Sequence, residues 1–264
     1  MLPKLISIGS FYIPTYGVLV AIGFLVAIWV TIHLGKSAGL APEQVTNLAT
    51  YCAIAGLIGA KVFMIAFDWQ DRGYGSNPGS IFSLNNLQAA GVYQGGLLLA
   101  ILTAIMYMRR QHMPILRTCD VFAPGLAAGH AIGRIGCLAA GCCWGQECHL
   151  PWAVTFNNTE TDTGVPVGIP LHPTQLYESL GNAAIFGFLF WRFRKRHVDG
   201  SIFGEYLVLY SLLRFGVEFF RAHQQGLQAG LSLTQWISIG TLIAGIWLLV
   251  RSRSTALAPP VSQY

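Results

Sequence analysis

The sequence predicts an all-α polytopic membrane protein with about seven transmembrane helices. Of the 264 residues, 53% are hydrophobic and only 10% are charged, whereas soluble domains carry about 25% charged residues. The mean hydropathy is +0.52. Most of the long apolar segments approach the roughly 20 residues that a helix needs to cross a bilayer. They lack the period-two alternation of membrane β-barrel strands, which favours helices throughout.

The apolar segments follow one another along almost the whole chain. Their approximate bounds are Phe11–Leu34, Thr46–Trp69, Tyr93–Met108, Thr118–Ala140, Gln175–Trp191, Ile202–Phe220 and Leu233–Val250. The third is short and includes Gly95 and Gly96 near its start, so we expect a broken or tilted span. The first has no small-residue cleavage site after a short apolar core, which favours a retained span over a signal peptide.

The basic residues predict the orientation. They gather in alternate loops and at the C-terminus: Lys36, Arg109, Arg110, Arg117, Arg192, Arg194, Lys195, Arg196, Arg251 and Arg253. By the positive-inside rule the N-terminus lies outside and the C-terminus lies in the cytoplasm. The loops Gln70–Leu87, Gly141–Pro173 and Arg221–Ser232 then share the outer face. This distribution also accounts for the net charge of +5 without a nucleic-acid partner.

The chain is expected to form one membrane domain, residues 1–251, followed by a polar cytoplasmic tail, residues 252–264, because no linker or repeat interrupts it. Gly125, Gly129 and Gly133 recur at intervals of four, a pattern that lets another helix approach closely. The loop Gln146–Leu171 is long enough to form a small periplasmic cap or a mobile gate.

Two arginines, Arg134 and Arg214, lie inside apolar segments. A guanidinium stays charged, so its burial in hydrocarbon costs several kcal/mol unless an anion or a polar cavity meets it. The pair indicates that an anionic headgroup, such as a phosphate, binds at membrane depth. Lys61 could add a third positive charge, or its long side chain could extend to an interface.

Ionisable residues recur at helical spacing around both arginines. His130, Arg134 and Cys137 share one helical face, and so do Tyr210, Arg214, Glu218 and Arg221. We expect Glu218 to pair with Arg214, which leaves Arg134 without an obvious partner.

The segment His172–Glu178 opens the fifth apolar segment. Pro173 suits the first turn of a helix, whose free N–H groups can meet an anion. Gln175 and Glu178 follow one turn apart, and this density of polar groups exceeds what capping needs.

Three strings together resemble the bacterial prolipoprotein diacylglyceryl transferase family: Gly133–Gly136 (GRIG), His172–Glu178 (HPTQLYE) and Tyr210–Arg221 (YSLLRFGVEFFR). Tyr16-Gly17 and Gly95-Gly96 also fit its pattern. The resemblance implies a seven-span inner-membrane enzyme that moves diacylglyceryl from phosphatidylglycerol to the lipobox cysteine of a preprolipoprotein and releases glycerol 1-phosphate.

By motif position, Arg134 and Arg214 match the two essential arginines of the family and would stabilise the departing phosphate. The candidate catalytic residues are therefore Arg134, Arg214 and Glu218, with His130 and His172. The candidate substrate-binding residues are Tyr16, Lys61, Gln94, Gly95, Gly96, Gln175, Tyr210 and Arg221.

The chain departs from the family pattern at three positions. Gln94 replaces the histidine proposed as the base, Cys137 replaces an asparagine, and Cys142 replaces a glutamate. A base or polarised water is still needed, because a free thiol is mostly protonated near neutral pH. Our hypothesis is that His130 or His172 takes this role; the alternative for His130 is a helix-to-helix hydrogen bond.

Four cysteines, Cys137, Cys142, Cys143 and Cys148, cluster at the outer end of the fourth apolar segment, followed by His149. Because cysteines that cluster outside the cytoplasm most often form disulfides, our first interpretation is that one or two disulfides join these residues. A zinc site is the second, because the spacing matches no familiar zinc finger. A catalytic thiol at Cys142 or Cys143 is the third, because it would form a stable thioether trap. The site prediction includes neither a metal nor a cofactor.

The predicted function is phosphatidylglycerol–prolipoprotein diacylglyceryl transfer. The expected partners are phosphatidylglycerol, the lipobox peptide and membrane lipids. The protein is expected to be a monomer of the bacterial inner membrane, with its active site toward the periplasm. The alternatives are a paralogue with the same phospholipid site and a different acceptor, and a non-catalytic lipid- or lipoprotein-binding protein. A transporter is disfavoured because the chain shows no duplicated halves.

Overall fold

The computed structural model describes residues 4–8, 11–69, 79, 81, 91–157, 163–222 and 228–257. In this part of the chain, seven long helices and two short strand pairs form, which confirms the all-α prediction. Four of these helices contain stretches long and apolar enough to cross a membrane: Thr15–Ser37, Pro42–Phe67, Ile115–Ala140 and Leu233–Ser252. Seven membrane spans and the orientation stay predictions.

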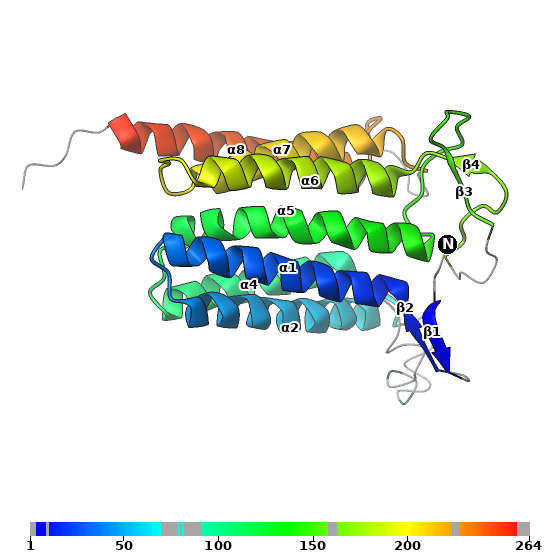
Figure 1. Cartoon of the computed structure of the whole chain (residues 1–264), viewed down its shortest axis with the longest axis horizontal. Coiled ribbons are helices and arrows are strands. Elements are labelled where there is room, and N and C mark those ends of the chain that lie inside the picture. The colour runs from blue at the N-terminus through cyan, green and yellow to red at the C-terminus, as the bar shows by residue number, and fades with distance from the viewer. Residues whose placement is uncertain are drawn as a thin grey trace, which may run out of the picture. The chain divides into compact units, whose positions relative to one another are not determined.

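The chain divides into two compact units. The first contains residues 1–34 and 119–264, and the second contains residues 35–118. Helices α1 (Thr15–Ser37) and α5 (Ile115–Ala140) lie mostly in the first unit, with α6 (Thr174–Phe193), α7 (Ser201–Glu218) and α8 (Leu233–Leu257); Figure 1 labels each helix. The second unit contains α2 (Pro42–Phe67) and α4 (Tyr93–Arg110). The single-domain organisation stays a prediction.

In the second unit, α2 and α4 pack through glycines on both helices. A Cβ at Gly59 would lie 2.5 Å from the Gly95 carbonyl oxygen, and a Cβ at Gly96 would lie 2.7 Å from the Gly56 carbonyl oxygen. Side chains at these positions would force the helices apart, because such distances are far below van der Waals contact. This packing accounts for Gly95 and Gly96 without a ligand.

In the first unit, glycines bring α1 and α5 together. A Cβ at Gly129 would lie 3.0 Å from the Gly23 carbonyl oxygen, and one at Gly125 would collide with the Thr31 hydroxyl. Close approach is thus confirmed at Gly125 and Gly129. The prediction of close approach is wrong for Gly133, where an added Cβ would meet nothing within 4 Å.

The chain before α1 is extended rather than helical. Strand β1 (Lys4–Ile8) pairs antiparallel with β2 (Phe11–Pro14), and α1 begins at Thr15. The predicted span start at Phe11 is therefore wrong. Pro14 explains the difference, because a proline disfavours helical geometry in the residue before it.

A buried carboxylate on α5 fixes the start of α7. Asp120 accepts hydrogen bonds from the backbone N–H groups of Gly200 at 2.6 Å and Phe203 at 2.7 Å. It satisfies N–H groups that have no partner within α7, and its negative charge faces the positive end of the helix dipole.

Helix α8 continues to Leu257, past residue 252, where the predicted tail begins; the tail boundary stays a prediction. Residues 258–264 of the tail lie outside the described residues. Gly204 on α7 and Gly245 on α8 let these two helices approach, because a Cβ at Gly245 would lie 3.1 Å from the Gly204 carbonyl oxygen.

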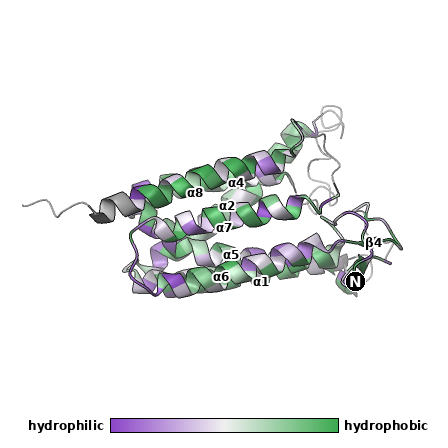
Figure 2. Cartoon of the chain, turned by 90° about the horizontal axis from the view of Figure 1, so that it is seen from above, coloured by the Kyte–Doolittle hydropathy of each residue, from purple (hydrophilic) through white to green (hydrophobic). Residues whose placement is uncertain are grey.

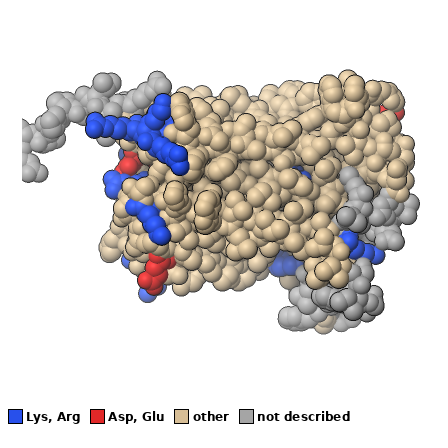
Figure 3. Space-filling model, in the orientation of Figure 1, with Lys and Arg blue, Asp and Glu red and all other residues tan. Residues whose placement is uncertain are grey.

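The lateral surface of the helices in the first unit suits a lipid environment. Large apolar side chains such as Leu25, Trp29 and Ile243 are exposed, and Figure 2 shows mostly apolar residues along α8. Lys and Arg side chains gather where α8 ends (Figure 3). There Arg251 lies over the Trp247 ring, an arrangement typical of a membrane interface.

The described part of the predicted cap loop forms a small folded layer beyond α5. Strand β3 (Val154–Thr155) pairs with β4 (Pro170–Leu171) over a core of Phe156, Val165 and Leu171. Single bridges join Gly145 to Arg221 and Glu147 to Leu171. Glu160 and Asp162 of this loop, and most of the loop Gln70–Leu87, lie outside the described residues.

Candidate active site

Glu178 on α6 joins the two arginines that the sequence singles out. Its Oε2 lies 2.7 Å from Nη2 of Arg134 on α5, and its Oε1 lies 3.5 Å from Nη1 of Arg214 on α7. Only 2% of the Glu178 side chain is exposed, against 14% for Arg134 and 9% for Arg214. The prediction that Arg134 lacks a partner is therefore wrong, because the partner comes from a different helix.

Glu218 forms a second carboxylate contact on α7. Its Oε2 lies 2.7 Å from Nη1 of Arg214, which confirms the predicted pair. Its Oε1 accepts a hydrogen bond from the Ser232 hydroxyl at 2.9 Å. Arg221 approaches the same carboxylate at 3.9 Å, but α7 ends at Glu218. The prediction that Arg221 continues the helical face is wrong.

We call Arg134, Arg214, Arg221, Glu178 and Glu218 the ionic cluster. Its three guanidinium groups outnumber its two carboxylates, so the cluster carries one excess positive charge. Each guanidinium also offers five N–H donors, more than the contacting carboxylate oxygens can accept. Burial makes an uncompensated cation costly. The cluster is thus electrostatically suited to a singly charged anion such as a phosphodiester.

His130 lies against the ionic cluster and holds Arg134. Its Nε2 accepts a hydrogen bond from Arg134 Nε at 3.2 Å and lies 3.8 Å from Glu178 Oε2. Its ring packs against Tyr210 at 5.3 Å between centroids. A guanidinium N–H only donates, so Nε2 is the acceptor and the ring proton sits on Nδ1. The lone pair that a base needs is already engaged.

The start of α6 holds the turn that follows α5. The Thr174 hydroxyl donates to the Cys143 carbonyl at 2.7 Å, and Gln175 Nε2 donates to the Cys142 carbonyl at 2.7 Å. Gln175 is 1% exposed. These two polar side chains of the HPTQLYE string therefore support the turn, which explains part of the polar density that capping alone does not.

His172 belongs to an aromatic group in the cap. Its Nδ1 lies 3.1 Å from the Tyr177 hydroxyl, which also accepts a hydrogen bond from Trp152 Nε1 at 2.8 Å. Its ring packs against Phe220. The contacts described for His172 order the cap and do not include the ionic cluster.

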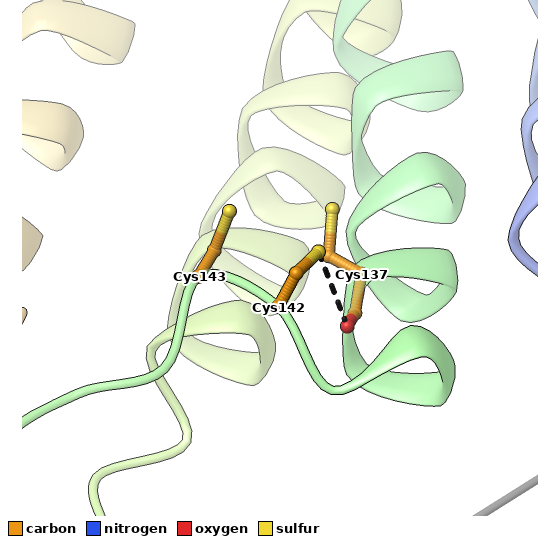
Figure 4. Close-up of side chains that lie close together, drawn as sticks. All are labelled: Cys137, Cys142 and Cys143. Carbon is orange, nitrogen blue, oxygen red and sulfur yellow. Dashed lines mark hydrogen bonds between the residues drawn. The ribbon is translucent and has the colours of Figure 1, made fainter. Parts of the chain in front are cut away.

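Three of the four clustered cysteines lie together. The sulfur atoms of Cys137, Cys142 and Cys143 are all within 4.8 Å of one another, at the end of α5 and in the turn that follows (Figure 4). All are free thiols, as is the buried Cys148, so the predicted disulfides are not formed.

The thiols of this turn differ in acidity. Contacts with Cys137 and Cys142 lower the pKa of the Cys143 thiol, and the charges of Arg134 and Arg221 act in the same direction. Contacts with Cys137 and Cys143 raise the pKa of the Cys142 thiol.

Comparison with known proteins identifies the family. The sequence profile of the prolipoprotein diacylglyceryl transferase family matches residues 3–251. A phosphatidylglycerol–prolipoprotein diacylglyceryl transferase of Clostridium tetani is 32% identical over 248 residues, which cover 94% of this chain and 96% of the relative. A second transferase, from Clostridium perfringens, is 33% identical and covers 89% of each chain. A third, from Nitratidesulfovibrio vulgaris, is 31% identical over 97% of this chain and 96% of the relative.

The chain belongs to the prolipoprotein diacylglyceryl transferase family.

The candidate residues of this family member are divided between the two units. Tyr16, at the start of α1, interacts electrostatically with Arg134 and with the three clustered thiols. It therefore lies beside the ionic cluster, as does Tyr210 through His130. Lys61 lies on α2, and Gln94 is exposed in the first turn of α4. These two, with Gly95 and Gly96, belong to the second unit.

The sequence prediction missed three residues that form or support the site in the described structure. Glu178 had a visible signal, because it is an acid at the start of an apolar segment, one turn after Gln175. Ser232 lies just before α8 and donates to Glu218 on α7, and Asp120 on α5 accepts from the start of α7, so both contacts join different segments of the chain. Helical spacing reveals neighbours only along one helix, so it could not predict those contacts.

Proposed function

We propose that this chain moves the diacylglyceryl group of phosphatidylglycerol onto the lipobox cysteine of a preprolipoprotein and releases glycerol 1-phosphate. The observation that carries the proposal is the buried carboxylate of Glu178 shared by Arg134 and Arg214, in a cluster with one excess positive charge. A protein of this family with this cluster has a site matched to one lipid phosphodiester.

The two arginines would bind the phosphate and stabilise its departure. As the carbon–oxygen bond breaks, the phosphate changes from a monoanion to a dianion, so fixed guanidinium groups bind the transition state more strongly than the ground state. Glu178 and Glu218 hold the guanidinium groups in place before the lipid arrives. The arginines are the catalytic residues, and the two glutamates position them.

His130 would position Arg134 rather than act as the base, because Arg134 Nε occupies its Nε2. His172 would order the cap through Tyr177 and Phe220. Replacing each histidine by alanine in a transfer assay tests the base hypothesis, and unchanged turnover in both variants would exclude it.

We place the reaction at the periplasmic face of the bacterial inner membrane, where a monomer would take phosphatidylglycerol from the outer leaflet. Lys and Arg gather in the alternate loops, whereas the sequence of the loop Gly141–Pro173 contains neither, and this difference supports the orientation. The basic residues after α6 and at the end of α8 would then face the cytoplasm.

Purified protein in phosphatidylglycerol nanodiscs, supplied with a lipobox peptide, tests the proposal. We expect thioether-linked diacylglyceryl peptide and one glycerol phosphate per transfer, and loss of both in Arg134→Ala. Release of glycerol phosphate only with a different thiol acceptor would identify the paralogue, the alternative raised by the departures at Gln94, Cys137 and Cys142. Phosphatidylglycerol binding without any release would identify a non-catalytic lipid-binding protein.

A further inference from the structure

The turn at the end of α5 brings three sulfur atoms to one place. Cys137 lies in the last turns of α5, and Cys142 and Cys143 lie in the chain that turns back from it. Figure 4 shows the Cys137 and Cys143 side chains pointing the same way, with Cys142 between them. Each sulfur is within 4.8 Å of the other two, and each residue is half-buried.

The backbone of this turn is strained in a way that gathers the thiols. Gly141 has a φ of 70° and Cys143 has a φ of 61°. A left-handed conformation is easy for glycine, but for a non-glycine residue it costs about 1–3 kcal/mol and persists only where the surroundings enforce it. Here the Thr174 and Gln175 side chains hold the carbonyls of Cys143 and Cys142. The arrangement of the sulfurs therefore does not depend on a bond between them.

Three converging thiols suit a thiophilic metal ion. Thiolate ligands select Zn²⁺ and Cu⁺ among the available ions. Zinc–sulfur bonds of about 2.3 Å at tetrahedral angles place sulfurs roughly 3.8 Å apart, so side-chain rotations that close the largest gap by about 1 Å would suffice. Three thiolates around Zn²⁺ carry one negative charge, and Cys143 interacts electrostatically with the Arg134 and Arg221 cations.

We propose that Cys137, Cys142 and Cys143 bind one Zn²⁺ ion as three thiolates and leave its fourth position open to the thiol of the acceptor cysteine. Three protein ligands with one open position are the pattern of catalytic rather than structural zinc sites. The role toward the acceptor rests on the proposed function, whereas the metal site itself does not.

This arrangement places thiol activation beside the leaving-group site. Cys137 lies one turn from Arg134 on α5. When the acceptor thiol coordinates Zn²⁺ it releases its proton to water, because a coordinating thiol is deprotonated. Its sulfur then attacks the glycerol carbon that bears the phosphate: the carbon–sulfur bond forms, the carbon–oxygen bond breaks, and the electron pair leaves with glycerol phosphate. The neutral thioether is a weaker ligand than a thiolate and leaves the metal.

Metal uptake by the full chain tests the site without any catalytic readout. The protein is reduced, stripped with a chelator and titrated with Zn²⁺ against a chromophoric competitor. We expect one equivalent to bind, and each of Cys137→Ser, Cys142→Ser and Cys143→Ser to weaken binding at least about 100-fold, because even residues that only support a ligand change affinity 10–100-fold. Cys148→Ser, which alters a cysteine outside the trio, should bind as the wild type does.

Cobalt provides a second measurement on the unaltered chain. Co²⁺ in the site should give thiolate-to-cobalt charge-transfer absorption, and a lipobox peptide should change the visible spectrum whereas its Cys→Ser analogue should not. Failure of the reduced wild type to take up Zn²⁺, or equal uptake by all four cysteine variants, overturns the site. A cobalt spectrum that the cysteine peptide leaves unchanged overturns the open position.

The outcomes separate this inference from the proposed function. Zinc uptake without any diacylglyceryl transfer would support the metal site and refute the proposed function. Transfer at the same rate and with the same pH profile in the stripped and the zinc-loaded protein would support the proposed function and refute a role for zinc in it. We expect the stripped protein to transfer at least about tenfold more slowly at pH 7, because a free thiol with a pKa of about 8.5 is mostly protonated there.

Discussion

Replacing Glu178 by glutamine removes one buried charge and keeps the shape of the side chain. Glu178 lies 2.7 Å and 3.5 Å from the guanidinium groups of Arg134 and Arg214. At these distances each charge pair interacts by about 5–6 kcal/mol at an effective dielectric constant of 20. Rehydration and rearrangement offset part of this, and the loss of one partner from a buried pair typically costs about 3–5 kcal/mol. We therefore expect Glu178→Gln to lower the free energy of unfolding by about 3–5 kcal/mol.

The same change should disable the site. The ionic cluster would carry two excess positive charges, and the repelled guanidinium groups would move from their positions. A displacement of about 1 Å can reduce a rate about 100-fold, so we expect at least that loss in transfer per folded molecule. Denaturant unfolding in mixed micelles, followed by tryptophan fluorescence, measures the stability. Product formation from phosphatidylglycerol and a lipobox peptide measures the activity.

Glu205→Gln is the matched control. Glu205 Oε1 lies 3.1 Å from Arg192 Nε, but 19% and 27% of the two side chains are exposed. Solvent screening limits such a pair to about 1 kcal/mol or less, and we expect transfer to be unchanged. The reasoning is refuted if Glu178→Gln resembles Glu205→Gln in both stability and activity.

The remaining predictions concern the guanidinium groups and the helix contacts. Arg134→Lys and Arg214→Lys keep the charge but lose the paired donors, and each should lower kcat/KM about 10²–10³-fold; a loss below tenfold in transfer assays would contradict this. Asp120→Ala leaves two backbone donors at the start of α7 without their partner. It should lower the free energy of unfolding by about 1–3 kcal/mol and leave the transfer rate per folded molecule unchanged. Gly23→Ala places a Cβ 2.8 Å from the Gly129 carbonyl oxygen, whereas an added Cβ at Gly240 meets nothing within 4 Å. Gly23→Ala should cost about 1–3 kcal/mol in denaturant unfolding, and equal stability of Gly23→Ala and Gly240→Ala would exclude steric contact as the reason.

The sequence predicted the helices well because long apolar runs with few charges admit few other structures in a membrane protein. It misplaced the beginning of the first helix because Phe11, Tyr12 and Ile13 are apolar in a strand as well as in a helix. Pro14 carried the distinguishing signal.

The site was predicted only in part, because spacing along one helix says nothing of contacts between helices. The pair Arg214 and Glu218 lies on one helix and was predictable. The contact of Arg134 with Glu178 joins α5 to α6 and depends on how these helices pack. Gly133 shows the same limit: it continues the spacing of Gly125 and Gly129, but an added Cβ there meets no neighbour, unlike those at the other two positions.

The position of the lipid phosphate tests the central claim most directly. A structure of the protein with phosphatidylglycerol bound in nanodiscs should place phosphate oxygens about 2.7–2.9 Å from guanidinium nitrogens of both Arg134 and Arg214. A phosphate that contacts only one of these arginines, or that lies away from Glu178 with the ionic cluster unchanged, would contradict the account.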